Sequence, residues 1–247
     1  MNTADNSGQI MTLSEVAAYL KLAEKTVLRL VHRGEIPCFK VASQWRFLRT
    51  VIDDWMLTRI QSLPSSGLAR LIGNEQPGVP VSRLLRPELI RLDIAPADKE
   101  AVLRQLTEPL VHARIVTASE SFVRKLLERE RMVSTGVGRG VALPHLRRPR
   151  ENPPGGPYLV LGICRQGTDF QALDGGKSHL FALLCADSEV IHLRIMAALA
   201  LLLRRGELVE ALVAAHDSRE VINMIIREDQ QQLFFPESET GAGAASK

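Results

Sequence analysis

The stretch Ser134–His145, STGVGRGVALPH, combines closely spaced glycines with a short apolar run that ends in proline and histidine. Within the run, Val141, Leu143 and His145 occupy alternate positions, so a strand would place them on one face. His145 stands at the end of that strand, which is where sheets interleaved with helices carry their sites. Imidazole has an unperturbed pKa of about 6.5, so much of it is neutral and nucleophilic in the cell. The stretch therefore predicts a strand with a reactive histidine at its end.

The glycines of this stretch follow a segment with helical periodicity and precede the strand. A dinucleotide-binding loop has the reverse order, so the glycines do not indicate a nucleotide, and we expect no cofactor. Glycine lets a backbone turn sharply and approach an anion closely. We expect Thr135, Gly136 and Gly138 to support a phosphate group near His145.

Two further residues fit an anion site. His192 lies one turn inside a predicted helix capped by Ser188, where the field of the helix disfavours a second ring proton and favours a nearby phosphate. Arg129 ends the helix before the glycines and could supply a fixed charge. Each residue also has an ordinary structural interpretation. Either histidine could be a satisfied core group, and Arg129 could pair with Glu128 or Asp187.

Helical and strand patterns alternate through the larger part of the chain. They predict helices over 99–113, 119–130, 188–204, 208–214 and 219–227, and strands over 141–145, 158–164 and 180–186. Strands that are apolar almost throughout and interleaved with helices indicate a sheet covered on both faces. The expected fold class of this part is α/β.

Breaks in the pattern divide the chain. Residues 62–80 are rich in Ser, Gly and Pro, as in an interdomain linker, and residues 147–157 have the composition of an exposed loop. We expect a small unit at 10–61, a linker at 62–80, a larger unit at 81–229 and a flexible tail at 230–247.

The small unit contains a predicted helix over 24–33 with a basic face. Lys25, Arg29 and Arg33 fall at i, i+4 and i+8 and stack three cations on that face. Like charges this close repel each other at a cost of a few tenths of a kcal/mol per pair, unless a bound polyanion neutralises them. DNA is such a polyanion, and its major groove is wide enough for a helix. A solvated helix face with a basic bias is the alternative interpretation.

Motifs around this helix occur in a recognisable order. They are MTLSEVAAYL at 11–20, KTVLRL at 25–30, GEIP at 34–37 and WRF at 45–47. In this order the small unit resembles the excisionase-like, MerR-related helix-turn-helix family. The resemblance implies a winged helix-turn-helix that binds double-stranded DNA, and such readers commonly act as homodimers. The expected DNA contacts are Lys25, Thr26, Arg29, Arg33, Lys40 and Arg46. At 42–44 the residues ASQ depart from the glycine and basic residue often found in the wing.

Four stretches of the larger unit also form a pattern. They are ERE at 128–130, STGVGRGVALPH at 134–145, LFALL at 180–184 and HLRIMAALA at 192–200. They resemble the fructose/mannitol-type enzyme IIA domain of the bacterial phosphotransferase system, and most closely its nitrogen-regulatory branch. The resemblance implies a mixed β-sheet sandwiched between helices, with a phosphorylated His145 supported by His192 and Arg129. The implied donor is phospho-HPr or its nitrogen-branch counterpart.

Two features depart from the enzyme IIA pattern. The loop LRRPRENPPGG at 146–156 is longer and more basic than expected, which bears on docking of the donor. His179 precedes the strand at 180–184, where an acidic or small polar residue is commoner. A metal site made of the three histidines at 145, 179 and 192 has no local support, and we expect no metal.

Composition sets wider bounds. The net charge of +3 is too small to argue for nucleic-acid binding unless the cations cluster. Three widely spaced cysteines form no CxxC pair, so a structural zinc site is not indicated. The N-terminus lacks the order of a secretory signal, and no apolar run approaches the ~20 residues of a membrane span. We expect a cytoplasmic bacterial protein without membrane insertion.

Together these features favour a regulator of transcription that accepts a phosphoryl group on His145 and couples it to DNA binding. Two other hypotheses stay open. In one, the larger unit has lost phosphoryl transfer and binds partners by its surface alone. In the other, the protein is a phosphocarrier to a sugar permease. The basic helix argues against this hypothesis, because a transport carrier needs no DNA-binding unit.

Overall fold

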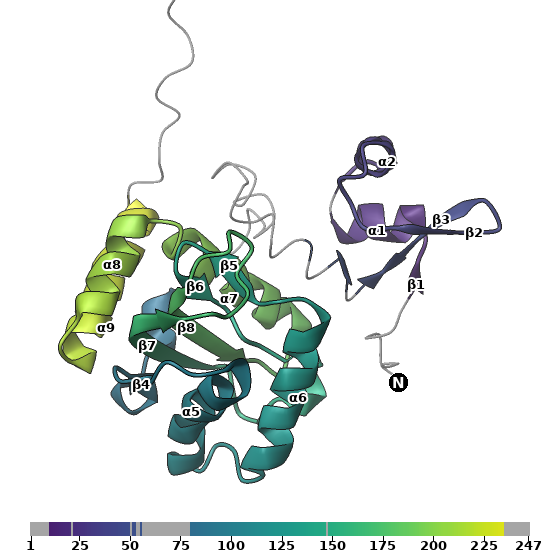
Figure 1. Ribbon diagram of the computed structural model, residues 1–247. Helices are drawn as coiled ribbons and strands as arrows, with labels where there is room; N and C mark the ends of the chain where they lie inside the picture. Colours follow the sequence, from purple (N-terminus) through teal and green to yellow (C-terminus); the bar gives the residue numbers. More distant parts are fainter. Residues whose placement is uncertain are drawn as a thin grey trace, which may run out of the picture.

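The computed structural model describes residues 10–20, 22–49, 51–52, 55, 80–146 and 148–234, whose helices and strands appear in Figure 1. Of the predicted linker, only Pro80 falls within these residues. Residues 230–234 continue the last helix instead of starting the predicted tail, because their glutamines and leucine favour helix. In this part of the chain, none of the helices has the length and apolar character needed to span a bilayer.

The N-terminal unit is a pair of helices beside a small antiparallel sheet. Its elements are β1 (Ile10–Met11), α1 (Leu13–Tyr19), α2 (Glu24–His32), β2 (Phe39–Val41) and β3 (Gln44–Leu48). The strand order is β1-β3-β2, and β2 and β3 form a hairpin at the position of the wing that the helix-turn-helix resemblance implies. Thr12 caps α1, accepting a bond from the Glu15 N–H at 3.3 Å while the Glu15 carboxylate accepts one from the Thr12 N–H at 2.7 Å. Apolar side chains from both helices and the sheet form its core.

The larger unit contains a five-stranded mixed sheet. Its strands are β4 (Ile90–Arg91), β5 (Gly136–Gly138), β6 (Val141–Ala142), β7 (Tyr158–Thr168) and β8 (Ser178–Cys185). The strand order is β4-β7-β8-β6-β5. The pairs β4·β7 and β6·β8 are parallel, whereas β7·β8 and β5·β6 are antiparallel. The mixed sheet implied by the enzyme IIA resemblance is therefore confirmed.

Helices cover both faces of this sheet (Figure 1). The helices are α5 (Lys99–His112), α6 (Ser119–Met132), α7 (Glu189–Leu202), α8 (Gly206–Ala214) and α9 (Ser218–Phe234), and the short 3-10 turns are η1 (Val81–Leu84), η2 (Pro87–Leu89) and η3 (Pro149–Glu151). Along β8, Phe181 and Leu183 join the core under α5 and α6, whereas Leu180 and Leu184 join the core under α7, α8 and α9. Because both faces are buried, the strands are apolar almost throughout.

Candidate functional site

His145 lies at the end of a strand, as the sequence predicts. Strand β6 stops at Ala142, and Pro144, which has no N–H to donate, interrupts the ladder. Pairing resumes at His145 as an isolated parallel bridge with Leu184 near the end of β8. The histidine is 3% exposed, so neighbouring side chains largely cover it.

Two contacts fix the protonation pattern of the His145 ring. Nδ1 lies 2.8 Å from the carbonyl oxygen of Leu143, which can only accept a hydrogen bond. Nε2 lies 3.2 Å from a guanidinium nitrogen of Arg129, which can only donate one. Both contacts are satisfied by a neutral ring with its proton on Nδ1. The nucleophilic lone pair is therefore on Nε2 and faces Arg129.

Arg129 lies in the last turn of α6, and the structure holds its guanidinium on two sides. One terminal nitrogen donates to the carbonyl oxygen of Val133 at 2.7 Å, and the other contacts Nε2 of His145. Val133 is the C-terminal cap of α6, whose last helical residue is Met132. With 6% of the residue exposed, this cation is a buried part of the site rather than a surface charge.

His192, on α7, completes the cluster. It lies in the first turn of α7, where its N–H donates to the carbonyl oxygen of Ser188 at 2.8 Å. The rings of His192 and His145 are 5.0 Å apart between centroids and tilted by 54°. Burial first, and then the charge of Arg129, lower the pKa of His192 to about 4. The direction matches the expectation from the helix N-terminus, but the main cause is desolvation.

The three predicted site residues thus come together although the chain separates them widely. They form one fixed positive charge beside two imidazole rings, of which His192 is held neutral. Such a site can attract a dianionic phosphoryl group and offer N–H donors to its oxygens, while Nε2 of His145 acts as nucleophile. At 3% exposure, His145 offers little surface to an incoming group, so access to Nε2 would require the side chains over it to move.

The residues predicted to support a phosphate have clear structural roles. Thr135 is buried, and its carbonyl oxygen accepts a bond from the Leu143 N–H at 2.9 Å. A Cβ on Gly136 would lie 2.8 Å from Cα of Ala172, and Gly138 combines a φ of +92° with a Cβ position 2.9 Å from Oδ2 of Asp174. Close packing against residues 172–174 therefore requires both glycines. Their contact with a phosphate stays a prediction.

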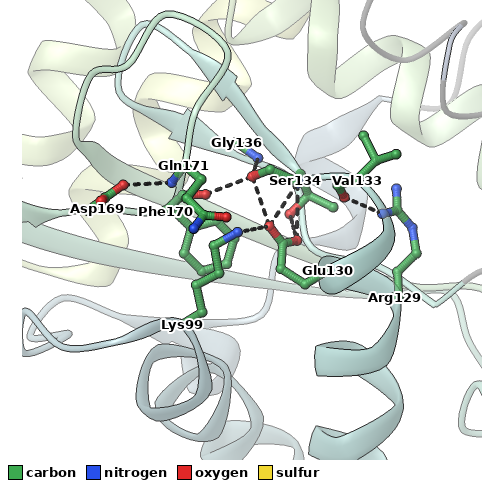
Figure 2. Close-up of polar contacts among 10 residues, drawn as sticks. Lys99, Arg129, Glu130, Val133, Ser134, Gly136, Asp169, Phe170 and Gln171 are labelled. Carbon is green, nitrogen blue, oxygen red and sulfur yellow. Dashed lines mark hydrogen bonds and ion pairs between the residues drawn. The ribbon is translucent and has the colours of Figure 1, made fainter.

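Two charged residues of the site were not among the predicted ones. The carboxylate of Glu130, directly after Arg129, is buried and accepts hydrogen bonds from Lys99, Ser134 and Thr135 (Figure 2). Glu130 occurs in the quoted ERE stretch, but no periodicity distinguishes its role from that of exposed Glu128. Lys99 is 31 positions away, and only the packing of α5 on α6 brings it to the carboxylate.

His179 lies in a different environment from the other two histidines. It precedes the apolar part of β8 and contacts the carbonyl oxygen of Arg165 at 3.3 Å. The Cβ position of Gly167 is only 2.5 Å from its ring. Among the residues that the structure describes, no group of three or more His, Cys, Asp or Glu side chains could hold a metal ion.

The predicted DNA-binding helix corresponds to α2, which ends at His32 with Arg33 as its C-terminal cap. Val27 and Val31 are buried in the N-terminal core, while the three cations of the predicted basic face, Lys25, Arg29 and Arg33, are exposed. Thr26 is half-buried. The helix is therefore amphipathic in the way that the sequence predicts, with one face in the core and the basic face in solvent.

The β2–β3 hairpin carries the other two predicted DNA contacts, Lys40 and Arg46, whose surroundings differ. Lys40 is exposed, and its Nζ lies 4.4 Å from the centroid of the Trp45 ring. The Arg46 guanidinium donates to Oε1 of Gln44 at 2.6 Å and to the carbonyl oxygen of Trp45 at 3.0 Å. Arg46 therefore supports the hairpin in this structure, and a role at DNA would require it to exchange these partners.

Comparison with known proteins identifies both parts of the chain. The family model of the phosphoenolpyruvate-dependent sugar phosphotransferase system, EIIA 2, matches residues 83–228, and a helix-turn-helix domain model matches residues 10–59. The fructose-specific EIIABC component of Bacillus subtilis is 28% identical over 152 residues, which are 61% of this chain and 24% of that protein. The chain thus spans only about a quarter of that relative.

Two further similarities concern nitrogen regulatory proteins. The nitrogen regulatory protein of Bradyrhizobium diazoefficiens is 29% identical over 150 residues, covering 60% of this chain and 95% of that protein. The crystal structure of nitrogen regulatory protein IIA-Ntr from Neisseria meningitidis superimposes with a TM-score of 0.53 at 23% identity, over 59% of this chain and 98% of that one. The chain therefore belongs to the EIIA 2 family of the phosphoenolpyruvate-dependent sugar phosphotransferase system and carries a helix-turn-helix domain ahead of its EIIA domain.

Proposed function

We propose that this protein is a cytoplasmic regulator that accepts a phosphoryl group on His145 and couples it to DNA binding. The proposed donor is phospho-HPr or its nitrogen-branch counterpart. The observation that carries the proposal is the geometry of His145, whose Nε2 faces the Arg129 guanidinium while Nδ1 is bonded to the Leu143 carbonyl.

In the proposed transfer, Nε2 of His145 attacks the phosphorus atom of the donor phosphohistidine. A new N–P bond forms on His145, and the electron pair of the breaking N–P bond returns to the donor ring. The proton on Nδ1 stays in its bond to Leu143 and offsets part of the incoming negative charge. The Arg129 N–H that now contacts Nε2 moves to a phosphoryl oxygen, because substitution removes the lone pair that it faces.

Incubation with enzyme I, HPr and labelled phosphoenolpyruvate tests whether His145 is phosphorylated. A parallel incubation uses the nitrogen-branch counterparts of enzyme I and HPr. We expect acid-labile label on the wild type and none on His145→Ala. His216→Ala is the matched control, since this histidine is exposed at the start of the segment that leads into α9. A wild-type protein that takes no label from either donor would exclude phosphoryl acceptance and favour a pure binding module.

Two observations support the coupling to DNA. The basic face of α2 is exposed, as a DNA contact requires. Leu193, the residue after His192 on α7, packs against the hydrophobic core of the N-terminal unit. A phosphoryl group brings roughly −1.5 to −2 charges, by analogy with phosphorylated hydroxyls. On His145 that charge would arise beside His192, whose ring centroid lies 5.0 Å away and which directly precedes Leu193 on α7.

Fluorescence anisotropy with a labelled duplex of random sequence tests the coupling at ~50 mM salt, where phosphate contacts are strong. We expect the phosphorylated and unphosphorylated wild type to differ several-fold in affinity, because the new charge disturbs the contact made by Leu193. His145→Ala, treated identically, should show no difference. Identical titrations of the two wild-type forms would separate the DNA-binding unit from the phosphoacceptor and contradict the coupling.

A further inference from the structure

One buried carboxylate, that of Glu130, gathers hydrogen bonds from three directions at the end of α6. Its side chain is 2% exposed. Oε1 accepts from Nζ of Lys99 at 2.9 Å and from Oγ of Ser134 at 2.9 Å, while Oε2 accepts from Oγ1 of Thr135 at 2.6 Å. The Thr135 N–H lies 3.0 and 3.1 Å from the two oxygens. Figure 2 shows this carboxylate between the Lys99 ammonium and the backbone at Ser134.

The contacts of Glu130 lead to His145 by two routes. In the first, Glu130 fixes the backbone just after Val133, whose carbonyl oxygen holds one end of the Arg129 guanidinium. The other end of that guanidinium contacts Nε2 of His145. Figure 2 shows Glu130 and Arg129 diverging from the same helix end, with the Val133 contact on the Arg129 side.

The second route passes through the strand that precedes the histidine. The N–H of Thr135 donates to Glu130, and the carbonyl oxygen of Thr135 accepts from the N–H of Leu143 at 2.9 Å. The carbonyl oxygen of Leu143 then holds Nδ1 of His145 at 2.8 Å. Both nitrogens of the ring thus depend on backbone groups that the same carboxylate holds in place.

We propose that Glu130 is a positioning residue of the phosphoacceptor site. It keeps the Arg129 guanidinium opposite Nε2 and keeps the ring proton of His145 on Nδ1, and it acts only through neighbouring groups. The inference rests on the proposed function in that the positioned nitrogen is the one that accepts the phosphoryl group.

A carboxylate suits this position better than an amide. Lys99 and Thr135 contact Glu130 only as donors. The single Ser134 hydroxyl proton is shared between Oε1 of Glu130 and the carbonyl oxygen of Phe170, while an ionised carboxylate only accepts. The amide of a glutamine at position 130 would point its NH₂ group at neighbouring N–H and O–H donors. Some of these buried donors would then have no acceptor, which is costly. Lys99 supplies the compensating charge, with its Nζ 2.9 Å from the carboxylate and 5.1 Å from the centroid of the Phe170 ring.

The test compares Glu130→Gln with Glu128→Gln, since Glu128 is an exposed glutamate two positions earlier on the same helix. We expect Glu130→Gln to lower kcat for phosphoryl uptake on the order of tenfold, the lower end of the loss that follows removal of hydrogen-bond partners behind metal-bound histidines, with KM for the donor unchanged. In ¹⁵N NMR spectra of the unphosphorylated protein, the His145 ring should lose its fixed Nδ1–H tautomer and become a tautomer mixture. Glu130→Asp should restore part of both properties because it keeps an acceptor-only group.

A second variant keeps the inference testable if Glu130→Gln fails to fold. Thr135→Val removes only the Oγ1 bond to Glu130 and should change kcat and the tautomer in the same direction by a smaller factor. The inference is overturned if both variants match Glu128→Gln in kcat and keep the Nδ1–H tautomer. In a third outcome, the wild type acquires no phosphoryl label while Glu130→Gln still converts the His145 ring from the Nδ1–H tautomer to a mixture. That outcome contradicts the phosphoacceptor proposal and supports the positioning of the ring by Glu130.

Discussion

The two regions with proposed chemistry hold their charges in opposite ways. In the EIIA domain, the Arg129 guanidinium and the Glu130 carboxylate are buried. Arg129 contacts Val133 and His145, and Glu130 accepts a hydrogen bond from Thr135. On α2, the cations at positions 25, 29 and 33 project from an exposed face. Buried charges need fixed partners, because desolvation is expensive, whereas exposed charges need only a polyanion to approach them. Geometry should therefore dominate in the first region and charge in the second.

The largest expected effect separates geometry from charge at Arg129. Arg129→Lys keeps the positive charge, but an ammonium cannot span the Val133 carbonyl and Nε2 of His145 as the planar guanidinium does. We expect kcat for phosphoryl uptake to fall on the order of a hundredfold, the scale of losing one fixed donor at a reacting group. Arg131→Lys makes the same exchange at an exposed arginine two positions further along α6 and should leave the rate unchanged. Equal rates for the two variants would mean that charge alone suffices.

The pH dependence of stability should also distinguish the two regions. His192 has a pKa lowered to about 4 in the folded protein, so the unfolded chain binds more protons between about pH 6.5 and that value. The free energy of unfolding therefore contains a contribution from neutral His192 that is fully present above about pH 6.5. This contribution is lost as the pH falls and amounts to roughly 3 kcal/mol over the window. His145 and Arg129 face the His192 ring, and neither is an acid that could offset this loss.

Urea unfolding at several pH values measures this effect in each unit separately. Both tryptophans, Trp45 and Trp55, belong to the N-terminal unit, so their fluorescence reports on that unit and far-UV circular dichroism mainly on the larger one. The EIIA transition should weaken with acid in the wild type and much less in His192→Asn. An EIIA domain equally stable at both ends of the window would contradict a neutral His192 ring.

The same contrast explains how far the sequence predicts the structure. Periodicity predicts the faces of single elements well, and the predicted helix over 99–113 corresponds to α5 at Lys99–His112. It misses β5, because the glycines at 136 and 138 carry no strand pattern, and only the fold brings β6 and Leu173 to the backbone there. In the site, the quoted motifs predict His145, Arg129 and His192. They do not predict Glu130 with Lys99, whose contact depends on two helices packing side by side.

Helix caps offer a smaller, matched comparison between the units. Thr12 caps α1, and Asp98 caps α5 by accepting from the Ala101 N–H at 2.8 Å. Replacing a capping side chain with alanine costs about 1 kcal/mol. Thr12→Ala should therefore shift the unfolding transition followed by tryptophan fluorescence, and Asp98→Ala the one followed by circular dichroism. If each variant shifted both transitions equally, the two units would unfold as one, and the contact at Leu193 would be much stronger than one side chain suggests.

The smallest expected effect concerns the exposed basic face. Arg29→Ala should weaken binding to a duplex of random sequence only a few-fold and reduce the slope of log affinity against log salt by about one, because it removes one phosphate contact. Arg219→Ala removes the same charge from an exposed position on α9 and should leave the slope unchanged. Phosphoryl uptake at His145 should be the same in both variants, since neither residue is among the contacts of the site. A slope that fell equally in both variants would mean that net charge, rather than the face of α2, governs DNA binding. The sharp division between a geometric site and an electrostatic surface would then hold only for the EIIA domain.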